Sequence, residues 1–143
     1  MDDKMITRIE ELGIVPVVKL SRADDAVPLA KALIAGGLPV AEVTFRTAAA
    51  EESIRRMAEA FPEMLVGAGT VLSIEQVERA IGAGAKFIVT PGFNPRVVSY
   101  CAEHEIPYHI EKTKIKEIVF DVRKEKNPCS LCAKLRRGAL STA

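Results

Sequence analysis

Short apolar runs alternate with amphipathic stretches along the first hundred residues of the chain. The runs are GIVPVVKL (13–20), PVAEVTF (39–45), MLVGAG (64–69) and KFIVT (86–90). Strands that alternate with helical stretches are typical of βαβ units, in which the strands form a parallel sheet. A fifth run, IPYHIE (106–111), continues the pattern, so we predict about five βα units.

The amphipathic stretches carry the signals with which helices begin. Ser21 precedes the first stretch, and Ser73 precedes another with Gln76 three residues later, as in a capping box. Asn94 and Pro95 stand where an N-cap and a first helical residue are expected. We predict helices over residues 1–12, 21–37, 48–61, 73–84, 94–105 and 127–140.

Composition narrows the classes of protein that the chain can belong to. Hydrophobic residues make up 48% of the chain, but aromatic residues only 5% with no Trp, so we expect an aliphatic core. The net charge of +1 provides no overall attraction for nucleic acid or for an anionic membrane. No apolar run approaches the ~20 residues that span a bilayer, and the acidic opening does not resemble a signal peptide. We therefore expect a soluble, cytoplasmic protein.

Polar residues follow the ends of the predicted strands, where parallel α/β folds bind ligands. Glu42 interrupts an apolar strand, and Arg46 follows four residues later. A carboxylate in such a place is costly to bury, so Glu42 is either a candidate acid or base or half of a structural pair with Arg46. Thr70 belongs to GAGTV, whose glycines indicate either a close approach of another group or a tight turn.

These motifs resemble a known family. GIVPVVKL, AKALIAGGLPVAEVTFRT and VGAGTVLSIEQVERAIGAGAKFIVTPGFNPRVVSYC are similar to the first half of the 2-keto-3-deoxy-6-phosphogluconate aldolases, over roughly residues 5 to 107. That family consists of class I aldolases built on a (βα)8 TIM barrel. The resemblance implies that Glu42 is the general acid or base and that Arg46 binds the carboxylate of pyruvate. It also implies that Thr70 and Pro91 line the pyruvate pocket.

The family's nucleophile is a lysine in a motif similar to V-K-F-F-P, and no such motif occurs in this sequence. The glycine-rich phosphate loops of the family's last two strands are also absent from it. By position, the nearest substitutes for the lysine are Lys19, Lys86, Lys112 and Lys114. A lysine that forms an imine needs a lowered pKa, which nothing in the sequence guarantees.

From IPYHIE onward the sequence resembles a second family. IPYHIEKT, EIV and NPCSLCAKLRRGAL are similar to the PP-loop ATPases that thiolate tRNA, over about residues 106 to 140. That resemblance implies that Cys129 and Cys132 are ligands of an iron–sulfur cluster. Two cysteines supply only half of a usual zinc or iron–sulfur ligand set, so free thiols and a redox-active pair are the alternatives.

Taken together, these patterns predict a single α/β domain over residues 1–143. We expect an open three-layer parallel sheet, flavodoxin-like or Rossmann-like and built partly from half a TIM barrel; the alternative is a half-barrel that dimerises. We expect a chimeric or engineered scaffold without efficient catalysis. The alternatives are residual keto-acid binding with weak class I aldolase activity, and a metal-binding or tRNA-binding fragment.

The expected partners follow from the same reasoning. We expect no cofactor; the alternative is an iron–sulfur cluster or zinc at Cys129 and Cys132. No partner is firmly expected, and a small keto acid is the ligand of the aldolase-like alternative. Nucleic acid and membrane are not expected to bind, and we expect a monomer or a homodimer. The order of the strands stays open, because a barrel fragment gives a sequential order whereas a doubly wound sheet requires a reversal.

Overall fold

The computed structural model describes residues 3–104, 106, 110, 112–124 and 126–140. The chain divides into two compact units, Met1–Tyr108 and His109–Ala143, which we describe separately. The boundary lies close to the change of character predicted near residue 107. The single domain over residues 1–143 stays a prediction.

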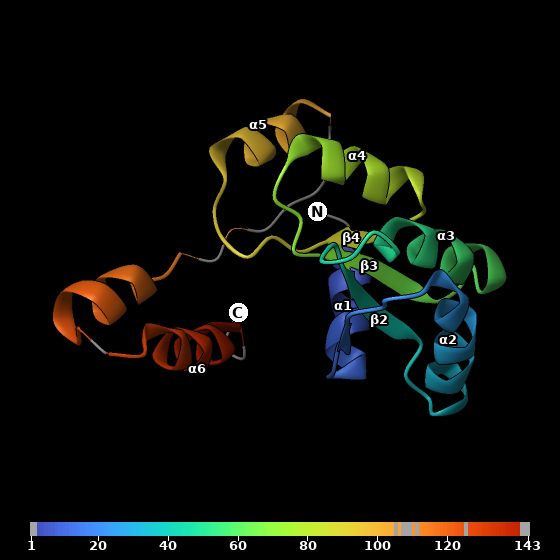
Figure 1. The fold of residues 1–143 in the computed structure, drawn as a ribbon, viewed down its shortest axis with the longest axis horizontal. Helices are drawn as coiled ribbons and strands as arrows, with labels where there is room; N and C mark the ends of the chain where they lie inside the picture. The colour runs from blue at the N-terminus through green and yellow to red at the C-terminus, as the bar shows by residue number, and fades with distance from the viewer. Residues whose placement is uncertain (1–2, 105, 107–109, 111, 125, 141–143) are drawn as a thin grey trace. The chain divides into compact units, whose positions relative to one another are not determined.

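The first unit is built on an open sheet of four parallel strands (Figure 1). The strands are β1 (Val17–Val18), β2 (Val40–Thr44), β3 (Leu65–Gly69) and β4 (Phe87–Ile88). Their spatial order is β1-β2-β3-β4, so the reversal that a flavodoxin-like sheet requires is missing from the described strands. The parallel α/β prediction is confirmed, and the sequential order is the one expected of a barrel fragment. The predicted fifth strand at 106–111 falls mostly outside the described residues.

Each strand is followed by a helix, as the alternating pattern predicts. The helical segments of the first unit are α1 (Asp3–Leu12), η1 (Ala23–Asp25), α2 (Ala26–Ala35), α3 (Ala50–Ala60), α4 (Ile74–Gly82) and α5 (Pro95–Glu103). Successive helices pack together, α2 against α3, α3 against α4, and α4 against α5, while α3 also contacts β2 and β3. The other face of β2 carries Glu42 and Thr44 together with Val40, which is fully buried.

Helix α2 begins later than the sequence predicts. A helix that began at Ser21 would place Pro28 beyond its first turn, where a proline removes a backbone hydrogen bond. The structure instead has a 3-10 turn at 23–25, and α2 starts at Ala26. Pro28 therefore falls in the first turn, where its missing N–H group costs nothing.

Two predicted helix starts are confirmed by hydrogen bonds. The backbone N–H of Gln76 donates to Ser73 Oγ at 3.3 Å, and Gln76 Oε1 in return accepts from the backbone N–H of Leu72 at 2.7 Å. The backbone N–H of Arg96 donates to Asn94 Oδ1 at 3.1 Å. These bonds satisfy N–H groups that have no partner inside the helix.

The core of the first unit lies between the sheet and these helices, and it is aliphatic, as the composition predicts. Alternate residues of β2 and β3 face the helices: Ala41, Val43, Val66 and Ala68 are fully or almost fully buried. They belong to one buried cluster with residues of α2, α3 and α4, namely Ala26, Ala30, Ile54, Met57, Val77 and Ala80. Because side chains alternate along a strand, Glu42, Thr44, Gly67 and Gly69 point to the opposite face.

The described residues of the second unit form two helical segments. A π-helical segment, η2 (Glu117–Val122), contacts α6 (Pro128–Leu140), and α6 confirms the predicted C-terminal helix.

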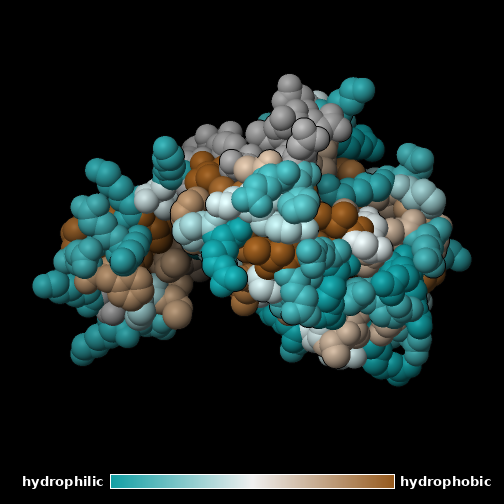
Figure 2. Space-filling view, turned by 90° about the horizontal axis from the view of Figure 1, so that it is seen from above, coloured by the Kyte–Doolittle hydropathy of each residue, from teal (hydrophilic) through white to brown (hydrophobic). Residues whose placement is uncertain are grey.

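Figure 2 shows that hydrophilic residues cover most of one face of the protein, with apolar residues between them. Within the described residues, no helix is long and apolar enough to cross a membrane.

Candidate active site

Glu42, Arg46 and Thr70 come from two neighbouring strands and lie toward the carboxyl ends of those strands. Glu42 is part of β2, Arg46 lies in the turn that follows β2, and Thr70 directly follows β3. The two strands run parallel, with Glu42 opposite Gly67 and Thr44 opposite Gly69. Their carboxyl ends therefore meet at one edge, as the sequence predicts.

The turn after β2 and the turn after β3 are joined by hydrogen bonds. Arg46 Nε donates to Thr70 Oγ1 at 3.2 Å. One residue earlier in each turn, the backbone N–H of Phe45 donates to the Gly69 carbonyl at 2.8 Å. The guanidinium group of Arg46 is thus tied to the Thr70 hydroxyl, although the Arg46 residue as a whole is exposed.

Thr70 has a backbone conformation that threonine rarely adopts. Its φ angle is +57°, in the left-handed region where a β-branched residue is an outlier. Such a conformation costs about 1–3 kcal/mol and persists only where the surroundings hold it. The segment that follows is held: the backbone N–H of Val71 donates to the Val89 carbonyl at 3.2 Å.

Glu42 extends across the neighbouring strand. A Cβ atom placed on Gly69 would lie 2.6 Å from Glu42 Cδ and 2.8 Å from Glu42 Cγ, so the glutamate side chain occupies the space that a larger residue would need. The tip of the Phe87 ring occupies the equivalent space over Gly67. The close approach predicted from GAGTV therefore takes place, and the approaching groups are side chains from β2 and β4.

Phe87 was not among the residues predicted for the site. KFIVT predicts only a strand, and the period-two pattern cannot say which neighbour a side chain covers. The signal that could have found it is the pair of glycines in VGAG, because two small residues on one face of a strand leave room for large neighbours.

Pro91 is exposed and lies in the segment between β4 and α5. The segment begins at the same edge of the sheet, since the backbone N–H of Val89 donates to the Ala68 carbonyl at 2.8 Å. It ends at Asn94, whose Nδ2 donates to the Leu72 carbonyl at 3.1 Å. Pro91 therefore belongs to the edge that carries Glu42, Arg46 and Thr70.

Two of the four lysines named in the sequence analysis fall in the first unit, at opposite edges of its sheet. Lys86 precedes β4, and its ammonium group donates to the Pro62 carbonyl, so it lies at the amino ends of the strands. Lys19 follows β1 at the carboxyl ends and is exposed. Lys112 and Lys114 are exposed residues of the second unit.

Cys129 and Cys132 lie at the start of α6, where Cys129 is exposed and Cys132 half-buried. No group of three or more His, Cys, Asp or Glu side chains suited to a metal ion occurs in the part of the chain that the structure describes. Cys101 is buried in α5 of the first unit, and burial raises the pKa of its thiol. The iron–sulfur or zinc site stays a prediction.

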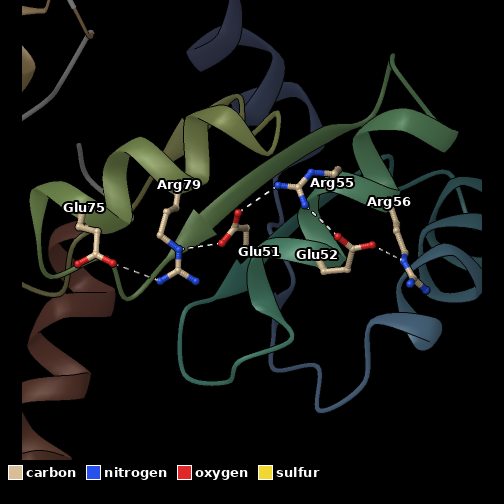
Figure 3. Close-up of polar contacts among 6 residues, drawn as sticks. All are labelled: Glu51, Glu52, Arg55, Arg56, Glu75 and Arg79. Carbon is tan, nitrogen blue, oxygen red and sulfur yellow. Dashed lines mark hydrogen bonds and ion pairs between the residues drawn. The ribbon is translucent and has the colours of Figure 1, made fainter.

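A chain of ion pairs runs along α3 and α4 (Figure 3). Arg79 Nε donates to Glu51 at 2.7 Å, and this bond is the main cause of a lowered pKa of the Glu51 carboxyl. Arg55 bonds both Glu51 and Glu52, at 3.0 and 2.9 Å. The pKa of Glu52 is lowered chiefly by its hydrogen bond from Arg56. These pairs connect α3 with α4, and Arg79 Cζ also lies 5.9 Å from the centroid of the Phe45 ring, one residue before Arg46.

Comparison with known proteins matches the sequence and the fold of this chain to one family. A family model described as KDPG and KHG aldolase matches residues 5–122. The 2-dehydro-3-deoxy-phosphogluconate aldolases of Treponema pallidum and Haemophilus influenzae are 52% and 48% identical over 99 and 104 residues, which cover 69% and 73% of this chain. The crystal structure of KDPG aldolase from Legionella pneumophila superposes with a TM-score of 0.69 at 31% identity.

This chain spans about half the length of the curated relatives, 47% and 49% of the two proteins named. The Legionella structure is matched over 90% of this chain and 66% of its own. The open sheet of four parallel strands thus corresponds to part of a TIM-barrel-like aldolase fold.

The comparisons contradict the prediction of a chimeric scaffold without efficient catalysis. Relatives that carry the name aldolase are 42–52% identical to this chain, and the family match continues to residue 122, past the predicted junction near residue 107. The prediction gave more weight to motifs that the sequence lacks than to the residues that it contains. The resemblance of residues 106–140 to PP-loop ATPases gains no support from these findings.

Proposed function

Because this chain belongs to the KDPG and KHG aldolase family, we propose that it functions in aldol cleavage of a 2-keto-3-deoxy acid to pyruvate and an aldehyde. Glu42, Arg46 and Thr70 form the pyruvate-binding part of the site. The observation that carries this proposal is the meeting of these three residues at one edge of the sheet, with Arg46 Nε 3.2 Å from Thr70 Oγ1.

Arg46 and Thr70 suit the carboxylate of a keto acid. A guanidinium group has five N–H donors in a rigid plane, and the bond to Thr70 occupies the one on Nε. The donors on the two terminal nitrogens can bind a carboxylate through two parallel bonds. The Thr70 hydroxyl, which accepts from Arg46, retains a proton that it can donate to the same carboxylate.

Glu42 suits the proton transfers of the reaction. In class I chemistry a lysine amine adds to the keto carbon, and loss of water gives an imine that accepts the electron pair of the broken carbon–carbon bond. A base removes the proton of the hydroxyl group as the aldehyde leaves, and an acid returns a proton to the carbon that becomes the methyl group of pyruvate. The Glu42 carboxylate lies across β3 toward the edge that carries Arg46 and takes both roles.

Covalent capture of the keto acid is supported by a relative. The Legionella protein was solved with pyruvate captured as a covalent carbinolamine intermediate. In the first unit of this chain, Lys19 is a lysine that follows a strand at the carboxyl-end edge. Lys19 is therefore the first lysine to test for an imine with pyruvate.

Pyruvate binding tests the proposal directly. A ligand at a hundred times its Kd adds about 2.7 kcal/mol to stability, so saturating pyruvate should raise the Tm of the protein. Arg46→Ala should abolish the rise, because it removes the cation that binds the carboxylate. Arg96→Ala, which removes an exposed arginine of α5, is the matched control and should keep the rise.

Borohydride trapping tests the covalent step in the same protein. Reduction of an imine with pyruvate leaves a stable secondary amine, which intact-mass measurement detects and peptide mapping assigns to one lysine. We expect one adduct per chain, lost in the Lys19→Arg variant if Lys19 carries the imine. Folded protein that shows neither a rise in Tm nor an adduct would contradict the proposed function.

A further inference from the structure

The end of β3 is shaped around the side chains of another strand. Gly67 and Gly69 lie on the same face of β3, and both are buried. Neither has a positive φ angle, since the glycines with positive φ in the described residues are Gly13, Gly37 and Gly84. The backbone at Gly69 therefore accepts any residue, and it is the Glu42 side chain that leaves no room for a Cβ atom.

The next residue, Thr70, presents the opposite case. Its backbone is in the left-handed region that disfavours threonine, yet its side chain is the acceptor for Arg46 Nε. Gly69 and Val71 on either side of it are held by backbone bonds to Phe45 and Val89. The strained residue is thus fixed in place, and its hydroxyl group is directed toward the turn after β2.

Both charged groups of the candidate site belong to β2 and its turn. Two successive residues contact them: Gly69 at the end of β3, and Thr70 directly after it. We propose that Gly69 and Thr70 are positioning residues, in which Gly69 sets the place of the Glu42 carboxylate and Thr70 sets the place of the Arg46 guanidinium. The distance between the proton-transfer group and the carboxylate-binding group then follows from one peptide unit at the end of β3. This inference rests on the roles proposed above for Glu42 and Arg46.

Gly69→Ala tests the first half of the proposal. The added methyl group meets the far end of a flexible side chain, so the fold is kept and the carboxylate moves. In protein labelled with ¹³C at glutamate Cδ, the chemical shift of the Glu42 signal, identified by its loss in Glu42→Gln, should change at constant pH, because the carboxylate occupies new surroundings. Gly82→Ala is the matched control, since a Cβ atom there meets nothing within 4 Å.

A double-mutant cycle keeps this test meaningful if Gly69→Ala also lowers stability. In Glu42→Ala the atoms that a Cβ of residue 69 would meet are gone, so Gly69→Ala should change the Tm less in that background than in the wild type. An equal loss in both backgrounds would assign Gly69 to the packing of the fold and overturn its positioning role.

Thr70→Gly and Thr70→Ser test the second half. Glycine accepts the left-handed backbone but removes the hydroxyl group, whereas serine keeps it. The Arg46 Nε–H proton should exchange faster with water in Thr70→Gly, and Thr70→Ser should restore the slow exchange of the wild type. An unchanged exchange rate in Thr70→Gly would contradict the role of Thr70.

These NMR readouts do not depend on pyruvate. If the Glu42 and Arg46 signals respond as expected while pyruvate leaves the wild-type Tm unchanged, the positioning role stands and the proposed function fails. If pyruvate raises the Tm but neither signal responds in Gly69→Ala and Thr70→Gly, the positioning role fails and pyruvate binding stands. If both hold, pyruvate should bind at least about tenfold more weakly to Thr70→Gly than to Thr70→Ser, which corresponds to about 1.4 kcal/mol.

Discussion

At the scale of single residues, the molecule separates positions that serve the core from positions that serve the site. Neighbours in β2 alternate between the two roles: Ala41 and Val43 are fully buried against the helices, whereas Glu42 between them points to the other face. The same alternation in β3 places Ala68 in the core and Gly69 beneath Glu42. A substitution of Ala41 or Val43 should therefore affect stability first, whereas a substitution of Glu42 should affect the candidate site.

Met57 provides the stability case. It is fully buried in α3, in the cluster that joins the helices to the sheet. Met57→Ala should lower the free energy of unfolding by about 2–5 kcal/mol, because it removes buried apolar atoms and leaves a cavity. Urea unfolding checks the value, with Glu59→Ala on the exposed side of the same helix as the control. A loss below about 1 kcal/mol would show that the neighbouring helices close the cavity.

At the scale of elements, hydrogen bonds and ion pairs hold the helices in their order around the sheet. Ser73 and Asn94 cap α4 and α5, and Asn94 also reaches the Leu72 carbonyl just before the start of α4. The ion pair between Arg79 and Glu51 joins α4 to α3. Arg56 joins α3 to Asp24 of the turn before α2 at 2.7 Å.

The acid stability of the protein should depend on the link between α3 and α4. The pKa of Glu51 is lower in the folded protein than in the unfolded chain, chiefly because Arg79 donates a hydrogen bond to it. Its contribution is therefore complete above the pKa of the unfolded chain and is lost as the pH falls through the folded pKa. An ion pair of this kind contributes about 0.2–1 kcal/mol.

Arg79→Gln should lower the free energy of unfolding at pH 7. It should also reduce the loss of that free energy between pH 7 and acid conditions. Urea unfolding at a series of pH values measures both effects. Arg8→Gln, which breaks an exposed pair with Glu11 inside α1, is the control and should leave the pH profile unchanged. A parallel profile for Arg79→Gln and the wild type would assign the acid sensitivity to other carboxyl groups.

At the scale of the whole molecule, the buried core cluster and the candidate site both belong to the first of the two compact units. The buried cluster of the fold and the residues Glu42, Arg46, Thr70 and Pro91 all belong to Met1–Tyr108. The second unit contains η2 and α6, and its buried residue Val119 lies outside that cluster. The family match nevertheless runs across the boundary to residue 122, so the second unit begins within the aldolase-like part of the chain.

A protein shortened to residues 1–108 should therefore fold and keep its response to pyruvate. We expect a single cooperative urea transition and a rise in Tm with saturating pyruvate equal, within error, to that of the full chain. Circular dichroism and thermal unfolding of both proteins provide the comparison. A shortened protein that lacks a cooperative transition would show that residues 109–143 complete the core of the first unit.

Much of this molecule was predictable from its sequence, for a local reason. Alternation of apolar runs and amphipathic stretches depends on neighbouring residues, so the parallel strands, the caps at Ser73 and Asn94, and helix α6 were all predicted. The same holds for the edge that carries Glu42, Arg46 and Thr70, because the carboxyl ends of parallel strands must meet. The prediction of a helix from Ser21 was wrong where it ignored Pro28, although that signal was present in the sequence.

Only the tertiary structure decided what depends on residues distant in the chain. The sequential strand order, the bond between Arg46 and Thr70, and the crossing of Glu42 over Gly69 are set by contacts between residues that lie 20 or more positions apart in the chain. A periodic pattern states which face a side chain occupies, but not which neighbour fills the space above a glycine. The sequence by itself therefore determined that Glu42, Arg46 and Thr70 lie at the carboxyl ends of neighbouring strands. Packing between strands decided how they are held there, and it also brought Phe87 over Gly67.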